Sequence, residues 1–132
     1  MRLLLFLTSL VFLISFGTVV RAEKSPVVEI ERAFGSGDAE KLLPYLGSTI
    51  DLRILETENL YGNAQAKVLL SNFFTANPPA GFVVIHRKMR SDNSFFIGTY
   101  SSRTNAYRVS IFLKIEQDKT RITQILIQNQ GS

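Results

Sequence analysis

Apolar residues recur at helical spacing in two stretches of the chain, and each stretch has its own start and stop signals. The first follows Ser25-Pro26, where a capping hydroxyl precedes a proline at the first helical position, and it ends at residues 35–37. The second follows Gly62-Asn63, which turns the chain and caps the helix, and it ends at residues 77–81. The buried stripes are expected to contain Val27, Ile30, Ala33 and Phe34 in the first helix and Ala66, Leu69, Leu70, Phe73 and Phe74 in the later one.

Between these two helices the pattern predicts a shorter helix and then a change of period. Asp38 is a suitable cap for the short helix, and Pro44 stops or kinks it. From residue 48 the period is two, which predicts a strand with Ile50, Leu52 and Ile54 on one face and a short partner strand over residues 58–61.

The last third of the chain predicts four longer strands, over residues 82–90, 95–102, 106–116 and 121–128. The polar breaks between them have hairpin length, so successive strands are expected to pair antiparallel as a meander. Helices followed by such a sheet indicate an α+β domain.

The first 22 residues have the pattern of a secretory signal peptide. Arg2 provides the charged start, residues 3–16 are mostly apolar, and Val20-Arg21-Ala22 offers a cleavage site. Cleavage after Ala22 leaves residues 23–132 as one domain, which is expected to be periplasmic or extracellular. The alternative is an uncleaved anchor, for which residues 3–20 are only just long enough to cross a bilayer.

The composition and the net charge indicate a globular domain and exclude several classes of protein. The 132 residues are 45% hydrophobic and 20% charged, as in a globular domain. Cysteine is absent, which excludes disulfides, thiolate sites and a lipid-carrying cysteine, so no stable membrane insertion is expected after cleavage. The net charge of +4 includes Arg2 and Arg21 of the signal, so the domain is nearly balanced and no nucleic-acid partner is expected.

The order of two helices, a strand pair, a helix and a four-stranded meander is accompanied by a set of short local motifs. These are Ala33-Phe34, Gly37-Asp38-Ala39, Tyr61, Gln65-Ala66, Phe73-Phe74, Pro78-Pro79, Phe82 and His86. In both respects the chain resembles nuclear transport factor 2-like domains, and within them a family of small exported bacterial domains of unknown function. The resemblance implies a cone-like fold, with N-terminal helices packed on a strongly bent, mainly antiparallel sheet. It also implies a cavity at the open end and pairing of two copies through the sheet, but it does not determine function.

His86 is the only histidine and the first candidate for acid–base chemistry, because histidine is the side chain that most readily exchanges a proton near neutral pH. In a regular strand it shares a face with Phe82, Val84, Lys88 and Arg90, so an apolar end gives way to a basic end. The alternative is a sheet histidine that only satisfies its own hydrogen bonds.

Other catalytic candidates come from the resemblance, which implies an acidic residue, a tyrosine or a histidine that projects into the cone. Asp51, Tyr61, Tyr100 and Tyr107 are available, but Asp51 is out of phase with the apolar face of its strand. A single histidine, no cysteine and scattered acids predict no metal site, and residues 35–37 follow a helix instead of opening one, unlike a phosphate loop. No cofactor is expected.

The basic run 86–90 could form a cationic surface with Arg103, Arg108 and Arg121 if the meander gathers them. The alternative is that these lysines and arginines only protect strand edges from aggregation. Among the aromatics, Phe96 shares a face with Tyr100, while Phe112 lies on the polar face of its strand. Such positions are expected to line a pocket or a dimer interface.

Together these observations predict an exported, non-catalytic binding module for a small apolar or amphipathic ligand or for a protein partner. A homodimer through the sheet is expected. Two alternatives stay open: a small enzyme of the isomerase, dehydratase or hydrolase type that uses His86 and Tyr61, and a purely structural dimerisation domain. The ligand is expected to be buried among Phe82, Val84, Phe96 and Tyr100, with His86 or Tyr61 as its polar contact at the mouth.

Overall fold

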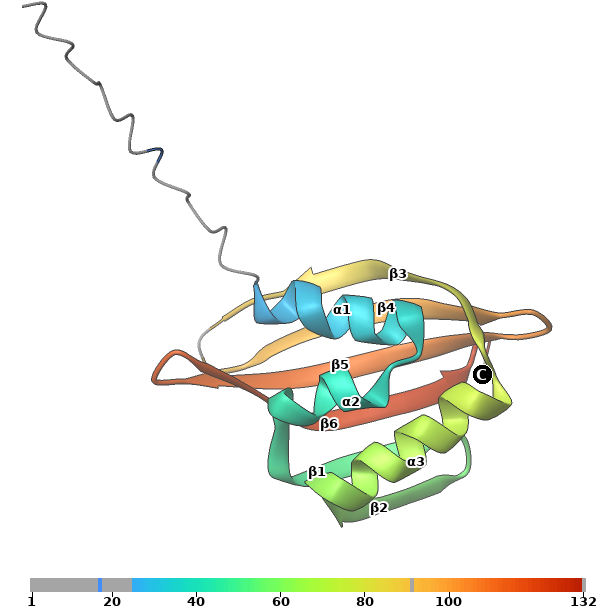
Figure 1. The fold of residues 1–132 in the computed structure, drawn as a ribbon, viewed down its shortest axis with the longest axis horizontal. Helices are drawn as coiled ribbons and strands as arrows, with labels where there is room; N and C mark the ends of the chain where they lie inside the picture. The colour runs from blue at the N-terminus through green and yellow to red at the C-terminus, as the bar shows by residue number, and fades with distance from the viewer. Residues whose placement is uncertain (1–16, 18–24, 91, 132) are drawn as a thin grey trace, which may run out of the picture.

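The computed structural model describes residues 17, 25–90 and 92–131. Three helices lie on one face of a curved six-stranded sheet that does not close into a barrel (Figure 1). The predicted signal peptide, residues 1–22, lies outside the described residues apart from Gly17, so it stays a prediction. The elements are α1 Pro26–Ser36, α2 Ala39–Leu42, η1 Leu43–Tyr45, β1 Leu46–Ile54, β2 Thr57–Gly62, α3 Asn63–Ala76, β3 Pro79–Lys88, β4 Ser94–Ser102, β5 Ala106–Glu116 and β6 Lys119–Asn129.

The sheet confirms the predicted α+β class and the predicted meander. Its strand order is β2-β1-β6-β5-β4-β3, and every neighbouring pair is antiparallel except β1 and β6. Strand β6 begins at Lys119, two residues earlier than the pattern predicted. Gln117 and Asp118 both have positive φ, 49° and 64°, so the β5–β6 connection is a two-residue turn of the kind that matches strand twist.

The predicted helices are present, and Ser25, Asp38 and Gly62 occupy their N-cap positions, but only Asp38 caps with its side chain. The Ser25 side chain makes no capping hydrogen bond, and only its carbonyl accepts a bond, from the Glu29 N–H at 3.1 Å. Asn63 is the first residue of α3 and not its cap, because Gly62 holds that position without a side chain to donate or accept. The Asp38 cap is confirmed, since its carboxylate accepts the Lys41 N–H at 3.4 Å.

The core lies between the helices and the inner face of the sheet, which is the face that the helices cover. In β1 and β5 alternate side chains point inward, as the period of two predicted, and β6 has the same alternation. Helix α1 packs over β3, and α3 packs over β1 and β2, so the two long helices cover opposite ends of the strand order. The fully buried side chains include Ile30, Phe34, Ile50, Leu70, Phe96, Tyr100, Val109, Ile111, Ile125 and Ile127.

Candidate ligand-binding cavity

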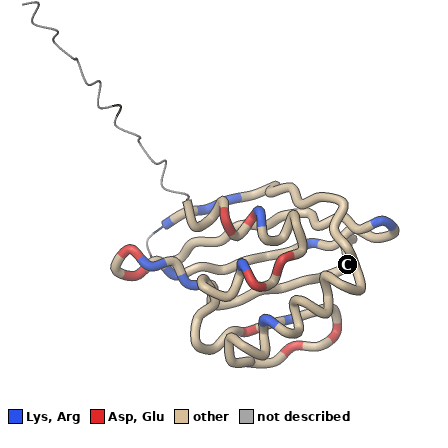
Figure 2. Tube along the Cα trace, in the orientation of Figure 1, with Lys and Arg blue, Asp and Glu red and all other residues tan. Residues whose placement is uncertain are grey.

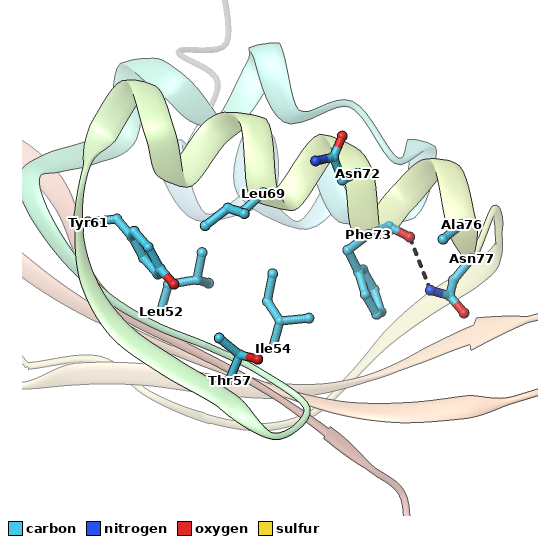
Figure 3. Close-up of a pocket in the computed structure, with 9 residues that line it drawn as sticks. All are labelled: Leu52, Ile54, Thr57, Tyr61, Leu69, Asn72, Phe73, Ala76 and Asn77. Carbon is cyan, nitrogen blue, oxygen red and sulfur yellow. Dashed lines mark hydrogen bonds between the residues drawn. The ribbon is translucent and has the colours of Figure 1, made fainter.

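A cavity of about 290 Å³ lies between α3 and the β1–β2 hairpin, on the inner face of the sheet (Figure 3). We refer to it as the hairpin cavity. Most of its walls are aliphatic or aromatic, and its polar groups are hydroxyls and side-chain amides. The lining residues are Leu52, Ile54, Thr57, Tyr61, Leu69, Asn72, Phe73, Ala76 and Asn77.

Local sequence rules place these side chains around the cavity. In β1, alternation turns Leu52 and Ile54 inward, and the antiparallel register places Thr57 of β2 opposite Ile54. On α3, Leu69 and Phe73 are four residues apart and therefore lie on one face of the helix, which packs over the hairpin.

Asn77 fixes the end of α3 against the meander. Its backbone carbonyl accepts the Tyr100 hydroxyl at 2.5 Å, and its side-chain oxygen accepts the Tyr107 hydroxyl at 2.7 Å. Its side-chain nitrogen donates to the Phe73 carbonyl at 3.2 Å. One residue at the cavity edge thus ties a helix end to two central strands, which makes this edge rigid.

The environment of Tyr100 favours its neutral form. Burial raises the pKa of Tyr100 from its ordinary value of 10.0 to about 12, and the neighbouring Tyr107 adds to the effect. The hydroxyl therefore stays protonated and keeps donating to Asn77 throughout the physiological pH range.

Of the six residues predicted to form the ligand pocket, Tyr61 alone lines the hairpin cavity. Phe96 and Tyr100 are fully buried, and the Tyr100 ring packs 5.5 Å from Phe73 and 5.9 Å from Phe74 between ring centroids. Phe82 stacks on Phe34 at 5.3 Å and covers Gly98, where a Cβ atom would lie 2.4 Å from the Phe82 ring. Rings thus fill the space that these residues were expected to line, and Val84 packs against the same core.

The prediction that His86 shares a face with Phe82 and Val84 is wrong. A β-bulge shifts the register of β3, so that Val84 pairs with Gly98 on the inner face but His86 pairs with Ile97. The extra residue turns His86 to the outer face, away from the helices and the hairpin cavity. There its ring lies 5.5 Å from the Phe95 ring, and it makes no hydrogen bond or ion pair in the part of the chain that the structure describes.

The same bulge helps to form an apolar surface on the outer face. We call it the outer patch, and its members are Val83, Ile85, Phe95, Ile97 and Phe112. Val83 and Ile85 are 64% and 61% exposed, and the Phe95 and Phe112 rings lie 5.9 Å apart. This places Phe112 on the face opposite the core, in agreement with its predicted position on the polar side of β5.

The predicted basic residues do not all gather into one surface, although Lys88 lies at the same end of the meander as Lys114 and Arg121. Arg87 pairs with Glu31 of α1, Arg103 lies in the β4–β5 turn, and Arg121 lies at the opposite end of the meander beside Lys114. Figure 2 shows basic and acidic segments interspersed along the described chain. Among the described residues there is also no group of three or more His, Cys, Asp or Glu side chains that could hold a metal ion.

Most residues of the hairpin cavity were predicted only as core positions or as a helix stop. Their faces were predictable, since Leu52, Ile54, Leu69 and Phe73 follow the period of a strand or a helix. The pattern carries no signal for the space between them, because that space depends on the distance between α3 and the hairpin.

A family model described as "Domain of unknown function (DUF4783)" matches residues 27–128 of the chain. Two solved structures of proteins from this family are similar to it. The one from Bacteroides ovatus is 31% identical, with a TM-score of 0.74 over 79% of this chain and 94% of that chain. The one from Bacteroides fragilis is 33% identical, with a TM-score of 0.74 over 78% of this chain and 97% of that chain.

A more distant likeness concerns the fold alone. A protein named "Rd1NTF2_04 with long sheet" is 13% identical, with a TM-score of 0.64 over 77% of this chain and 95% of that chain. No curated protein matches the chain. Within the described part of the chain, no helix combines the length and the apolar character that a membrane crossing requires.

Proposed function

The chain belongs to the DUF4783 family of domains of unknown function, and from this premise we propose that it is a non-catalytic binding module for a small apolar or amphipathic ligand. The binding site is the hairpin cavity. The observation that carries the proposal is a mostly apolar space of about 290 Å³ with a few polar groups at its walls. Pockets of about this size and character are typical ligand sites.

A second hollow lies between α2 and α3, and its charged lining makes it a poorer site for an apolar ligand than the hairpin cavity. It measures about 430 Å³, and its lining includes Asp38, Glu40 and Lys67. Lys67 and Glu40 already form an ion pair at 2.5 Å across it. Such a solvated, charged groove favours water over an apolar ligand.

The position of His86 favours binding over the enzyme alternative. A general acid or base must reach the molecule on which it acts. His86 lies on the outer face, whereas the hairpin cavity lies on the inner face. Tyr61, the other residue of that alternative, lines the cavity without His86 beside it.

The proposal is tested by filling the cavity from α3. Leu69→Trp places a large ring in the hairpin cavity, and Val68→Trp is the matched control because Val68 is 51% exposed on the same helix. The probe is 1-naphthalenemethanol, and binding is measured by calorimetry and by amide chemical shifts. Binding should be lost in Leu69→Trp and retained in Val68→Trp, with cooperative unfolding in both.

Retained binding in a folded Leu69→Trp variant would place the probe elsewhere and refute the proposed site. Absence of any probe binding to the unsubstituted protein would also count against a small-ligand function.

A homodimer through the sheet is a second element of the proposal, supported by the outer patch. Val83 and Ile85 expose apolar side chains on an unpartnered sheet face, and burial of such a surface against a second copy is favourable. The test is Val83→Glu against Val68→Glu, an exposed apolar residue on the helix side. Sedimentation should show a dimer for the control and a monomer for Val83→Glu, and equal behaviour of both variants would contradict the interface.

Export is the third element, supported by the pattern of residues 1–22. The mass of the full chain expressed in a bacterial host distinguishes the two alternatives. A product that begins at Glu23 in the periplasm or medium is expected, whereas an intact chain in the membrane fraction would indicate an anchor.

A further inference from the structure

We infer that the hairpin cavity selects an uncharged ligand with an apolar body and one hydrogen-bonding group, and that the Tyr61 and Thr57 hydroxyls bind this group. The inference rests on the proposed binding function, since it names the class of ligand that the same cavity takes. It follows from where the fold places the charges and the free hydroxyls around the cavity.

The charged side chains of the hairpin point away from the cavity. Arg53 and Glu58 are opposite each other in the register of β1 and β2, on the outer face, and the Arg53 Nε donates to the Leu55 carbonyl at 3.0 Å. Asp51 is also on the outer face, where its carboxylate accepts a hydrogen bond from the Gln124 side chain at 3.0 Å. Alternation along the two strands thus leaves neutral side chains on the inner face.

Helix α3 adds no charge to the cavity either. Lys67 is its one charged residue, and the ammonium group pairs with Glu40 of α2 at 2.5 Å. No Asp, Glu, Lys, Arg or His is among the described residues that line the cavity. An ionic ligand would therefore lose hydration there without gaining a counter-charge, which is strongly unfavourable.

Two hydroxyls remain available for a polar group, because the Asn72 amide points away from the hairpin on the other side of α3 (Figure 3). The Tyr61 and Thr57 hydroxyls make no hydrogen bond within the described part of the chain. Figure 3 shows both side chains on the β2 side of the cavity, across from Leu69 and Phe73 of α3. A ligand can thus place its polar group against β2 and its apolar body against α3.

The polar atoms of Asn77, unlike these two hydroxyls, already make hydrogen bonds within the protein. Its two carbonyl oxygens accept the hydroxyls of Tyr100 and Tyr107, and its side-chain nitrogen donates to Phe73. A hydrogen bond between Asn77 and a ligand would compete with the hydrogen bonds that hold α3 to the meander. The hydroxyls of β2 are therefore the favoured polar contact.

The experiment compares four probes with one ring system: 1-naphthalenemethanol, 1-naphthoate, 1-naphthylmethylammonium and 1-methylnaphthalene. At neutral pH the alcohol is expected to bind at least ~10-fold more tightly than either ion, because only the ions lose hydration without compensation. Binding of the alcohol that is abolished by Leu69→Trp, combined with equal or tighter binding of an ion at the same site, would overturn the inference and leave the proposed function standing. Failure of the alcohol and of 1-methylnaphthalene to bind at all would instead refute the proposed function.

The hydroxyl contacts are tested with Tyr61→Phe and Thr57→Val, which keep the shape of each side chain. Each variant should weaken the alcohol ~3- to 10-fold, the value of one neutral hydrogen bond, and leave 1-methylnaphthalene unchanged. The matched controls are Tyr45→Phe in η1 and Thr99→Val on the outer face, which should change neither probe. Equal losses for both probes in the Tyr61 and Thr57 variants would show that these side chains only shape the cavity, and would overturn their assignment.

Discussion

The two long helices cover opposite ends of the same sheet, but the space beneath them is filled differently. Under α1, the rings of Phe34, Phe82 and Phe96 occupy the inner face over β3 and β4, and Gly98 provides room for one of them. Under α3, smaller side chains such as Leu52 and Leu69 leave the hairpin cavity. We call the first region the filled half and the second the open half.

The comparison shows that a periodic apolar face does not by itself determine whether a helix seals a core or covers a cavity. Both halves have the same pattern of inward apolar residues. In the filled half the aromatic side chains reach across the gap between helix and sheet, whereas in the open half the aliphatic ones do not. Phe73 lies at the boundary, since it contacts Tyr100 and Tyr107 and also lines the cavity.

The largest expected effect compares one truncation in each half. Phe34→Ala should lower the free energy of unfolding by about 3–5 kcal/mol, because Phe34 is fully buried against Phe74 and Phe82. Leu69→Ala should cost only about 1–2 kcal/mol, because Leu69 is half-buried and already borders an open space. Urea unfolding measures both changes. Equal losses of unfolding free energy would show that the two halves are packed equally well.

A smaller effect is expected from adding one methyl group in the filled half. Gly98→Ala places a Cβ atom 2.4 Å from the Phe82 ring, which is held against Phe34, so the core must shift. The expected loss is about 1–3 kcal/mol of unfolding free energy. Gly81→Ala is the control, since nothing lies within 4 Å of its added Cβ, and it should stay within about 0.5 kcal/mol of the unsubstituted protein. Similar values for the two variants would mean that the Phe82 ring does not fill the space over Gly98.

The smallest effect concerns the tyrosine network between the halves. The folded state raises the pKa of Tyr100 from 10.0 to about 12, so in this range the folded chain holds a proton that the unfolded chain has lost. This contribution to stability is complete below pH 10 and falls as the pH rises through about 12. In Tyr100→Phe the decline of unfolding free energy between these pH values should be shallower, whereas Tyr45→Phe should retain it. Parallel pH curves for Tyr100→Phe and the unsubstituted protein would show that Tyr100 does not cause the decline.

Prediction from sequence succeeded where the signal is local. The stripe of α1, the Asp38 cap and the alternation of β1 and β5 were all predictable, because each depends on neighbours within a turn of helix or along one strand. It failed for the face of His86, since a single extra residue in β3 reverses every position after it. The pattern of residues 82–90 contains no glycine or proline that would mark such a bulge.

The candidate site was predictable only in part. Tyr61, predicted as a polar contact of a pocket, lines the hairpin cavity, whereas Phe82 and Phe96, which were named with it, belong to the filled half. The positions of the aromatic residues on their strands predicted that they line a pocket. In the structure their rings pack against one another and fill the space instead.

The sequence by itself determined the α+β class, the antiparallel meander and the faces of most helices and strands, because periodicity and turn residues act over short distances along the chain. Only the tertiary structure decided which face His86 occupies, which rings close the filled half and where a cavity remains. The reason is physical: register shifts and the separation of a helix from a sheet depend on contacts between residues far apart in the sequence, such as Phe82 with Gly98 and Asn77 with Tyr107.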